Sequence, residues 1–195
     1  MPSPSFANRG HAYSAHTIFP CRVAEYLLLG RAAKLKSNRP VYLSRSRLST
    51  SGTGRVIRNE PEFEEWLSSC GALICRPETM SLEQQVFMFN NYTTFIGCWG
   101  SAFHNLMFCR ELCGVTLHIL SGWGMNPNYF LFDAILGLES HYINCLRPTP
   151  GAPQPGPTPH RDPRWFEHPW YKYSMIDMDI DIGLMRSYLA ENQII

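Results

Sequence analysis

The chain has 195 residues, of which 45% are hydrophobic and 13% aromatic, and its formal net charge is +1. These values predict a packed globular protein and exclude a disordered chain. Because the net charge is close to zero, broad nucleic-acid binding is excluded as well. Any recognition of an anion must therefore depend on individually placed arginines.

The seven cysteines do not follow a metal-binding or disulfide pattern, because no two are spaced as CxxC and their number is odd. We expect them to be small buried thiols in a reducing compartment. Residues 1–16 lack the apolar core of a signal peptide. No stretch supplies the roughly 18–20 apolar residues that a membrane span needs. We therefore expect a soluble, cytoplasmic protein with no cofactor.

In chain order, helices and strands alternate through most of the sequence. The elements predicted from caps, apolar spacing and β-propensity are a helix at 22–36, a strand at 41–44, a helix at 59–69, a strand at 72–75, a helix at 82–91, a strand at 94–98, a helix at 102–110, a strand at 115–120, a helix at 128–138, a strand at 142–146 and a helix at 181–192. Residues 49–54 form a predicted turn.

Two of these helices have defined caps and apolar faces. Asn59 and Ser81 are the predicted N-caps. The apolar side chains expected to point inward are Phe63, Trp66 and Leu67 in the first helix, and Val86, Phe87 and Phe89 in the second.

This alternation predicts an α/β fold, a Rossmann-like parallel sheet with helices on both faces. The predicted organisation is an N-terminal polar segment and helix at 1–39, a Rossmann-like core at 40–147, a proline-rich loop at 148–164, and an aromatic segment with a helix at 165–195. Ligands of such sheets bind outside the carboxyl ends of the strands.

Arginines gather after the first predicted strand. Arg45 stands at the end of the strand, and Arg47, Arg55 and Arg58 follow it. A guanidinium suits a phosphate because its planar fork donates paired hydrogen bonds and stays charged. An equally compatible interpretation is a solvated turn whose arginines pair with the acidic residues of the next helix. Those acidic residues are Glu60, Glu62 and Glu64.

The strand at 94–98 breaks into a loop of small residues around Gly97, Gly100 and Ser101. The loop is neither a GxGxxG fingerprint nor a Walker A sequence. Its backbone N–H groups could approach a pyrophosphate. A tight packing turn explains the same residues equally well.

Other chemistry-bearing residues are better explained structurally. Asp177, Asp179 and Asp181 alternate with apolar residues, which predicts an edge segment leading into a helix cap instead of a metal site. A lone His104 is most often a hydrogen-bonded structural residue. No hydrolytic triad motif is present, and no catalytic residue is assigned.

Taken together, several segments resemble the catalytic region of the glycosyltransferase 61 family, which also includes capsular-polysaccharide biosynthesis proteins. The matching segments are residues 41–46, 55–60 with Phe63, 77–78, 81–86, and 96–105 with Phe108. The resemblance is dense from 40 to 120.

The resemblance implies a GT-B-like architecture whose C-terminal Rossmann-like lobe holds a nucleoside-diphosphate sugar, and inverting transfer to a glycan without an essential metal. It assigns the donor diphosphate to Arg45 and Arg55, and the nucleoside side to Glu78 and Gln85. It also implies that Gly97, Gly100 and Ser101 offer amides to the phosphates, while Asn105 braces their loop.

Two departures from the family pattern leave alternatives open. Trp99 holds the place between the glycines where the family usually has histidine, which raises the question of whether His104 replaces it. The segment before Pro40 is too short for an acceptor-binding lobe, so a partner lobe or chain is expected. The alternatives are a catalytically inactive nucleotide-sugar-binding or regulatory module, and some other nucleotide-binding α/β protein.

Overall fold

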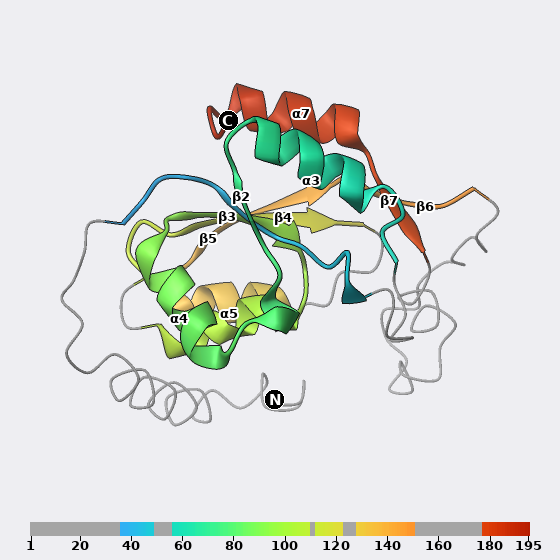
Figure 1. Ribbon diagram of the computed structural model, residues 1–195. Coiled ribbons are helices and arrows are strands. Elements are labelled where there is room, and N and C mark those ends of the chain that lie inside the picture. The colour runs from blue at the N-terminus through green and yellow to red at the C-terminus, as the bar shows by residue number, and fades with distance from the viewer. Residues whose placement is uncertain (1–35, 49–55, 110–111, 123–127, 151–176) are drawn as a thin grey trace.

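A five-stranded parallel sheet in the order β2-β1-β3-β4-β5 forms the centre of the protein (Figure 1). The computed structural model describes residues 36–48, 56–109, 112–122, 128–150 and 177–195. The strands are β1 at Val41–Leu43, β2 at Leu73–Cys75, β3 at Thr94–Cys98, β4 at Thr116–Ser121 and β5 at Glu139–Asn144. The predicted α/β class and parallel sheet are confirmed.

Helices cover both faces of this sheet, as predicted. The helices are α3 at Glu60–Ser69, α4 at Leu82–Asn91, α5 at Asn128–Leu136 and α7 at Ile182–Glu191, with 3₁₀ helices η2 at Pro77–Thr79 and η3 at Ser101–Phe108. Figure 1 shows α3 and α7 on one face and α4 and α5 on the other. Within the described ranges, no helix is long and apolar enough to cross a membrane.

Strand β1 lies in the middle of the hydrophobic core and connects its two halves. Val41 and Leu43 belong to the half under α4 and α5, whereas Tyr42 packs with Phe63 in the half under α3 and α7. All three strand residues are buried. This alternation follows from the two-residue period of a strand that is covered on both faces.

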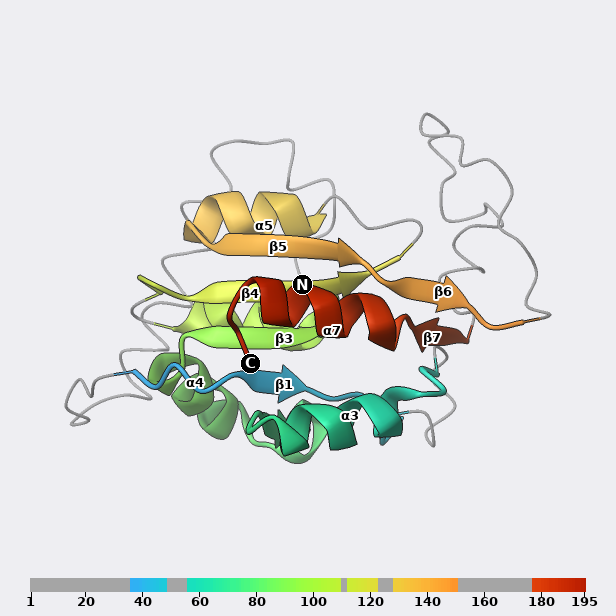
Figure 2. The same ribbon diagram turned by 90° about the horizontal axis from the view of Figure 1, so that it is seen from above.

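A small antiparallel ribbon lies beyond the carboxyl ends of the large sheet (Figure 2). It joins β6 at Leu146–Pro148 to β7 at Met178–Ile180. Ile57 pairs with Met178 in an isolated bridge beside it. The Asp181 side chain accepts a hydrogen bond from the Leu184 backbone N–H at 3.0 Å. The predicted edge segment and helix cap at residues 177–181 are therefore confirmed.

Two predictions about helix α3 and helix α4 are wrong in detail. The Asn59 side chain does not cap α3, because it exchanges two hydrogen bonds of 2.8 Å with the Ile180 backbone. In α4 the exposed fraction of Phe87 is 43%, and Met88 is buried in its place. At 100° per residue, Phe87 and Met88 lie equally far from the side that Val86 and Phe89 share, so helical spacing alone does not decide which of the two is buried.

Two further predictions are wrong in the type or the bounds of the element. The segment after β3 is a 3₁₀ helix instead of an α-helix. Phe103, Leu106 and Cys109 are buried at a spacing of three, which is the period of a 3₁₀ helix. Strand β5 begins at Glu139 instead of Tyr142, because its polar first residues lie at the sheet edge, where apolar patterning is weak. The predicted helix at 22–36, the turn at 49–54 and the aromatic segment at 165–173 lie outside the described residues.

His118 in β4 is a buried titratable group on the α7 side of the sheet. Its exposed fraction is 4%, and its Nδ1 atom lies 3.0 Å from the Tyr188 hydroxyl. The ring stacks on His141 with centroids 5.2 Å apart. Burial and the neighbouring His141 lower the pKa of His118 from 6.5 to about 4.

Acid should therefore destabilise the fold through His118. Since its folded-state pKa lies below the unfolded value, the stabilising effect of neutral His118 is complete above pH of about 6.5 and disappears as the pH falls towards 4, a loss of up to about 3 kcal/mol. We expect His118→Phe to reduce this acid destabilisation, measured as the free energy of urea unfolding from pH 7 to pH 4. His141→Gln removes only the smaller cause of the pKa shift, the charge of a half-buried neighbouring ring, and should reduce the acid destabilisation less. Identical pH slopes for the wild type and His118→Phe would contradict the assignment.

Candidate functional site: the crevice between β1 and β3

The order of the strands creates a crevice between β1 and β3. The chain leaves β1 through α3 to reach β2 on one side, and then crosses through α4 to β3 on the other side. Because α3 and α4 cover opposite faces, the two connections diverge at this point. In doubly wound sheets with this strand order, ligands bind at that switch point, outside the carboxyl ends of the strands.

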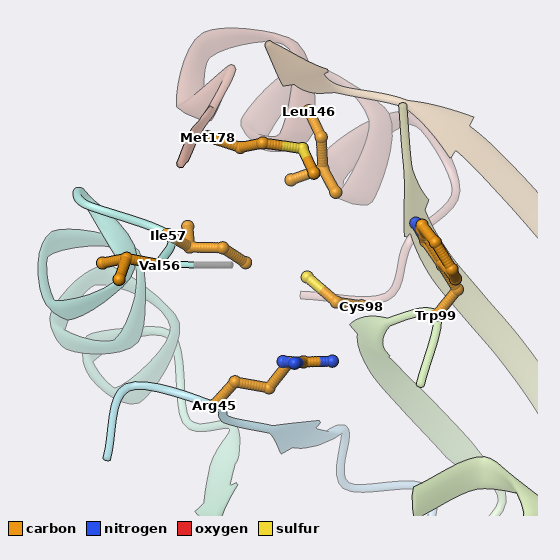
Figure 3. A pocket seen from close by; sticks show the side chains of 7 residues that line it. All are labelled: Arg45, Val56, Ile57, Cys98, Trp99, Leu146 and Met178. Atoms are coloured by element: carbon orange, nitrogen blue, oxygen red, sulfur yellow. The ribbon is translucent and has the colours of Figure 1, made fainter. Parts of the chain in front are cut away.

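Arg45 lies at this switch point, two residues after the end of β1. Its backbone N–H donates to Glu60 Oε1 at 2.8 Å. Its Nη1 atom lies 3.0 Å from the place that a Cβ of Gly100 would occupy. Figure 3 shows the side chain extending from β1 towards Cys98 and Trp99. The absence of a side chain at Gly100 therefore leaves room for the guanidinium, which would have to shift by a few tenths of an ångström beside a Cβ, whereas the extended backbone of Gly100 does not require glycine.

Arg45 and Arg58 form no ion pair with a described acidic residue of α3, contrary to what the solvated-turn alternative expects of them. Among the described residues, the ion pairs of arginine join Arg58 to Asp177 at 3.3 Å and Arg76 to Glu64 at 2.5 Å. Neither pair includes Arg45, whose contact with Glu60 is made by its backbone. Within the described structure, the guanidinium of Arg45 therefore remains available to a ligand.

The sequence analysis did not identify the buried carboxylate beneath Arg45. Glu60 is 1% exposed, and its Oε1 atom accepts from the Tyr42 hydroxyl at 2.8 Å as well as from the Arg45 backbone. Burial raises the pKa of Glu60, although these hydrogen bonds and the Arg45 charge oppose the shift. Burial, with Glu60 beside the hydroxyl, also raises the pKa of Tyr42. One carboxylate thus supports both Tyr42 in the core of β1 and the backbone of Arg45.

A second buried carboxylate lies one helical turn further along α3. Glu64 accepts a hydrogen bond from the Ser44 hydroxyl and forms the ion pair with Arg76. A signal for both glutamates was present in the sequence. Glu60 and Glu64 share one helical face with Phe63 and Leu67. The helical spacing therefore places both carboxylates on the same buried side as these apolar residues.

Five of the predicted site residues line one cleft of about 350 Å³ at the crevice. They are Arg45, Glu78, Gln85, Gly100 and Asn105. The other lining residues are Leu43, Ser44, Leu48, Pro77, Cys98 and Ala102. This size is within the range of small-molecule sites, which hold about 300–1,000 Å³.

Three of the remaining predicted site residues, Gly97, Trp99 and Ser101, are described and lie beside residues that line this cleft. Trp99 is buried, contacts Tyr129 edge-to-face at 5.9 Å, and lines a narrow pocket on the other side of Arg45 (Figure 3). Gly97 lies within β3, where a Cβ would stand 3.1 Å from that of Leu43. Ser101 begins η3. Arg55 lies outside the described residues.

His104 packs away from the residues that line the cleft. Its ring stacks on Tyr129 at 5.3 Å and contacts Phe132 edge-on at 5.2 Å. Burial lowers the pKa of His104. Its buried Nδ1 atom has no hydrogen-bond partner in the described part of the chain, so the expected hydrogen-bonded histidine is not observed at that atom.

Across the described residues, no group of three or more His, Cys, Asp and Glu side chains is placed to hold a metal ion. The fold and the cleft define the protein as an α/β protein with a cleft at the carboxyl ends of a parallel sheet.

Residues 6–116 match the family model described as Glycosyltransferase 61. The match covers more than half of the chain and includes β1, β2, β3 and every residue found in the cleft. The chain therefore belongs to the glycosyltransferase 61 family. No curated protein matches it.

Proposed function

We propose that the protein transfers a sugar from a nucleoside-diphosphate sugar to a glycan, and that the cleft between β1 and β3 binds the donor. The observation that carries the proposal is the position of Arg45 against Gly100 at the switch point of the sheet. Membership of a glycosyltransferase family supports sugar transfer as the reaction. In this proposal the sheet is the donor-binding lobe of a GT-B-like enzyme.

The donor diphosphate binds beside Arg45. The guanidinium supplies a fixed positive charge and a pair of donors. The backbone N–H groups of Ser101 and Ala102 precede the first intrahelical bond of η3, which runs from Phe103 to Gly100, and they are further donors. Together these groups stabilise the charge that develops on the leaving diphosphate, which is the task that a metal ion performs in other enzymes.

The proposed transfer inverts the configuration at the anomeric carbon. An acceptor hydroxyl attacks that carbon on the face opposite the diphosphate, and the new carbon–oxygen bond forms as the bond to the phosphate oxygen breaks. The nucleoside diphosphate leaves with the electron pair, and a general base takes the hydroxyl proton.

A thermal-shift screen tests the proposal directly. The full chain is heated with UDP-, GDP-, CDP- and ADP-sugars, in EDTA and in Mg²⁺. We expect one donor class to raise Tm by several degrees in EDTA, since a ligand at 100 times its Kd adds about 2.7 kcal/mol of stability. If no donor raised Tm, the proposed site would be wrong. A shift seen in Mg²⁺ alone would overturn the metal independence.

A further inference from the structure

The orientation of the Gln85 amide in the cleft is fixed by its partners. One nitrogen, Nε2, lies 2.9 Å from the Pro77 carbonyl and 3.2 Å from the Met80 carbonyl. Carbonyl oxygens only accept hydrogen bonds, so both contacts require the NH₂ group of Gln85 on that side. Its Oε1 atom must therefore face the other way, towards Asn105.

That orientation fixes Asn105 in turn. Asn105 Nδ2 donates to Gln85 Oε1 at 2.7 Å. Since Oε1 can only accept, the Asn105 amide has one permitted orientation, with Nδ2 towards Gln85. No described residue donates to its Oδ1 atom. A relay that starts at two backbone carbonyls thus leaves the Asn105 Oδ1 atom as an acceptor without a described donor, while Nδ2 keeps one further N–H.

The other polar side chain that closes this part of the cleft is also an acceptor. Glu78 lies in η2, directly after β2, and its exposed carboxylate is in no ion pair among the described residues. In the strand order, β2 lies beside β1 on the side away from β3 and Gly100. The cleft is therefore divided: cationic and amide donors lie at the β1–β3 crevice, and acceptors lie towards β2 and α4.

A diphosphate fits only the donor side, because the Glu78 carboxylate would repel it. The acceptor side suits a neutral group that carries O–H or N–H donors. In a nucleoside diphosphate the group next to the phosphates is the ribose, whose 2′- and 3′-hydroxyls are neighbouring donors.

We propose that the Asn105 Oδ1 atom and the Glu78 carboxylate accept hydrogen bonds from the ribose hydroxyls of the donor, and that Gln85 is the positioning residue that holds Asn105 in this role. The inference rests on the proposed function and extends it. It makes the cleft selective for ribonucleoside diphosphates over their deoxy counterparts.

The test compares ribonucleoside diphosphates with their 2′- and 3′-deoxy forms, and with inorganic pyrophosphate, by calorimetry on the full chain. We expect the tightest-binding ribonucleotide to lose about tenfold or more in affinity when a hydroxyl is removed. Asn105→Ala and Glu78→Ala should each reduce this preference several-fold, and neither should lower pyrophosphate affinity. The control Glu62→Ala removes an exposed carboxylate of α3 and should leave the preference intact.

Two further variants separate orientation from simple loss of a side chain. Asn105→Asp keeps an oxygen at the cleft but turns a second oxygen towards Gln85 Oε1, so we expect the ribose preference to fall although the variant stays folded by Tm. Gln85→Ala should also reduce the preference, while pyrophosphate binding persists.

Each outcome has a definite meaning. Equal affinity of the wild type for ribo- and deoxynucleotides, or an unchanged preference in both alanine variants, would overturn the inference while the donor site stands. If neither pyrophosphate nor any nucleoside diphosphate bound, the proposed function itself would fail.

Discussion

Replacing Arg45 by alanine should weaken the binding of a nucleoside diphosphate by about 10- to 100-fold, which corresponds to about 1.4–2.8 kcal/mol. The side chain supplies the charge at the β1–β3 crevice, and within the described structure it forms no ion pair, although the Glu60 carboxylate lies near enough to interact with it. Stability should change little, since the bond from residue 45 to Glu60 is made by the backbone N–H. Calorimetric titration with the diphosphate and with pyrophosphate measures the effect.

Two variants separate the effect of net charge from the effect of the paired hydrogen-bond donors of the guanidinium. Arg58→Ala removes a nearby arginine that is exposed and already paired with Asp177, and it should leave affinity within about twofold. Arg45→Lys retains the charge but not the paired donors, so an intermediate loss is expected. Equal losses in Arg45→Ala and Arg58→Ala would show that the effect is one of net charge, and no loss in Arg45→Ala would refute the site.

Replacing Glu60 by alanine should lower the free energy of unfolding by about 2–4 kcal/mol. The change leaves the buried Tyr42 hydroxyl and the Arg45 backbone N–H without their common acceptor, and unsatisfied buried groups cost about 1–3 kcal/mol each. Urea unfolding of the wild type and the variant at neutral pH measures this difference.

Glu60→Gln is the matched control, because its amide oxygen can still accept both hydrogen bonds. The wild-type carboxylate is penalised by burial, so the glutamine variant should be as stable as the wild type within about 1 kcal/mol. It also removes a negative charge beside Arg45, so affinity for the diphosphate should rise a few-fold. A large loss of stability in Glu60→Gln would mean that the charge of Glu60, and not its role as an acceptor, stabilises β1.

Much of the fold followed from local patterns in the sequence. Helix α4 and strand β3 have the predicted bounds, because the Ser81 capping box and the apolar run at 94–98 are local signals. The actual role of Asn59, which does not cap α3, could not be predicted in this way. Its real partner, Ile180, lies far along the chain and is brought near only by the β6–β7 ribbon.

The candidate site was predicted only in part, because local patterns in the sequence place only some of its residues. Arg45 and Gly100 follow strand ends, so the sheet rule was enough to place them together. The hydrogen bonds of Gln85 and Asn105 depend on side-chain orientation, which no spacing rule supplies. To predict that Glu60 is buried, one must know whether it lies on the solvated face or the core face of α3. The adjacent Pro61 and Glu62 favoured the solvated face.

The hydrogen bonds between Asn59 and Ile180 also imply an order in which the parts of the site form during translation. Residues 56–59, which lead into the helix that carries Glu60, are held by the 177–180 segment through these bonds, the Arg58–Asp177 pair and the Ile57–Met178 bridge. As the chain emerges from the ribosome, β1, β2 and β3 can pair long before residue 180 appears. The support for Arg45 would then be completed only when residues 177–180 have been made, so a nascent chain stalled before Asp177 should bind the diphosphate poorly.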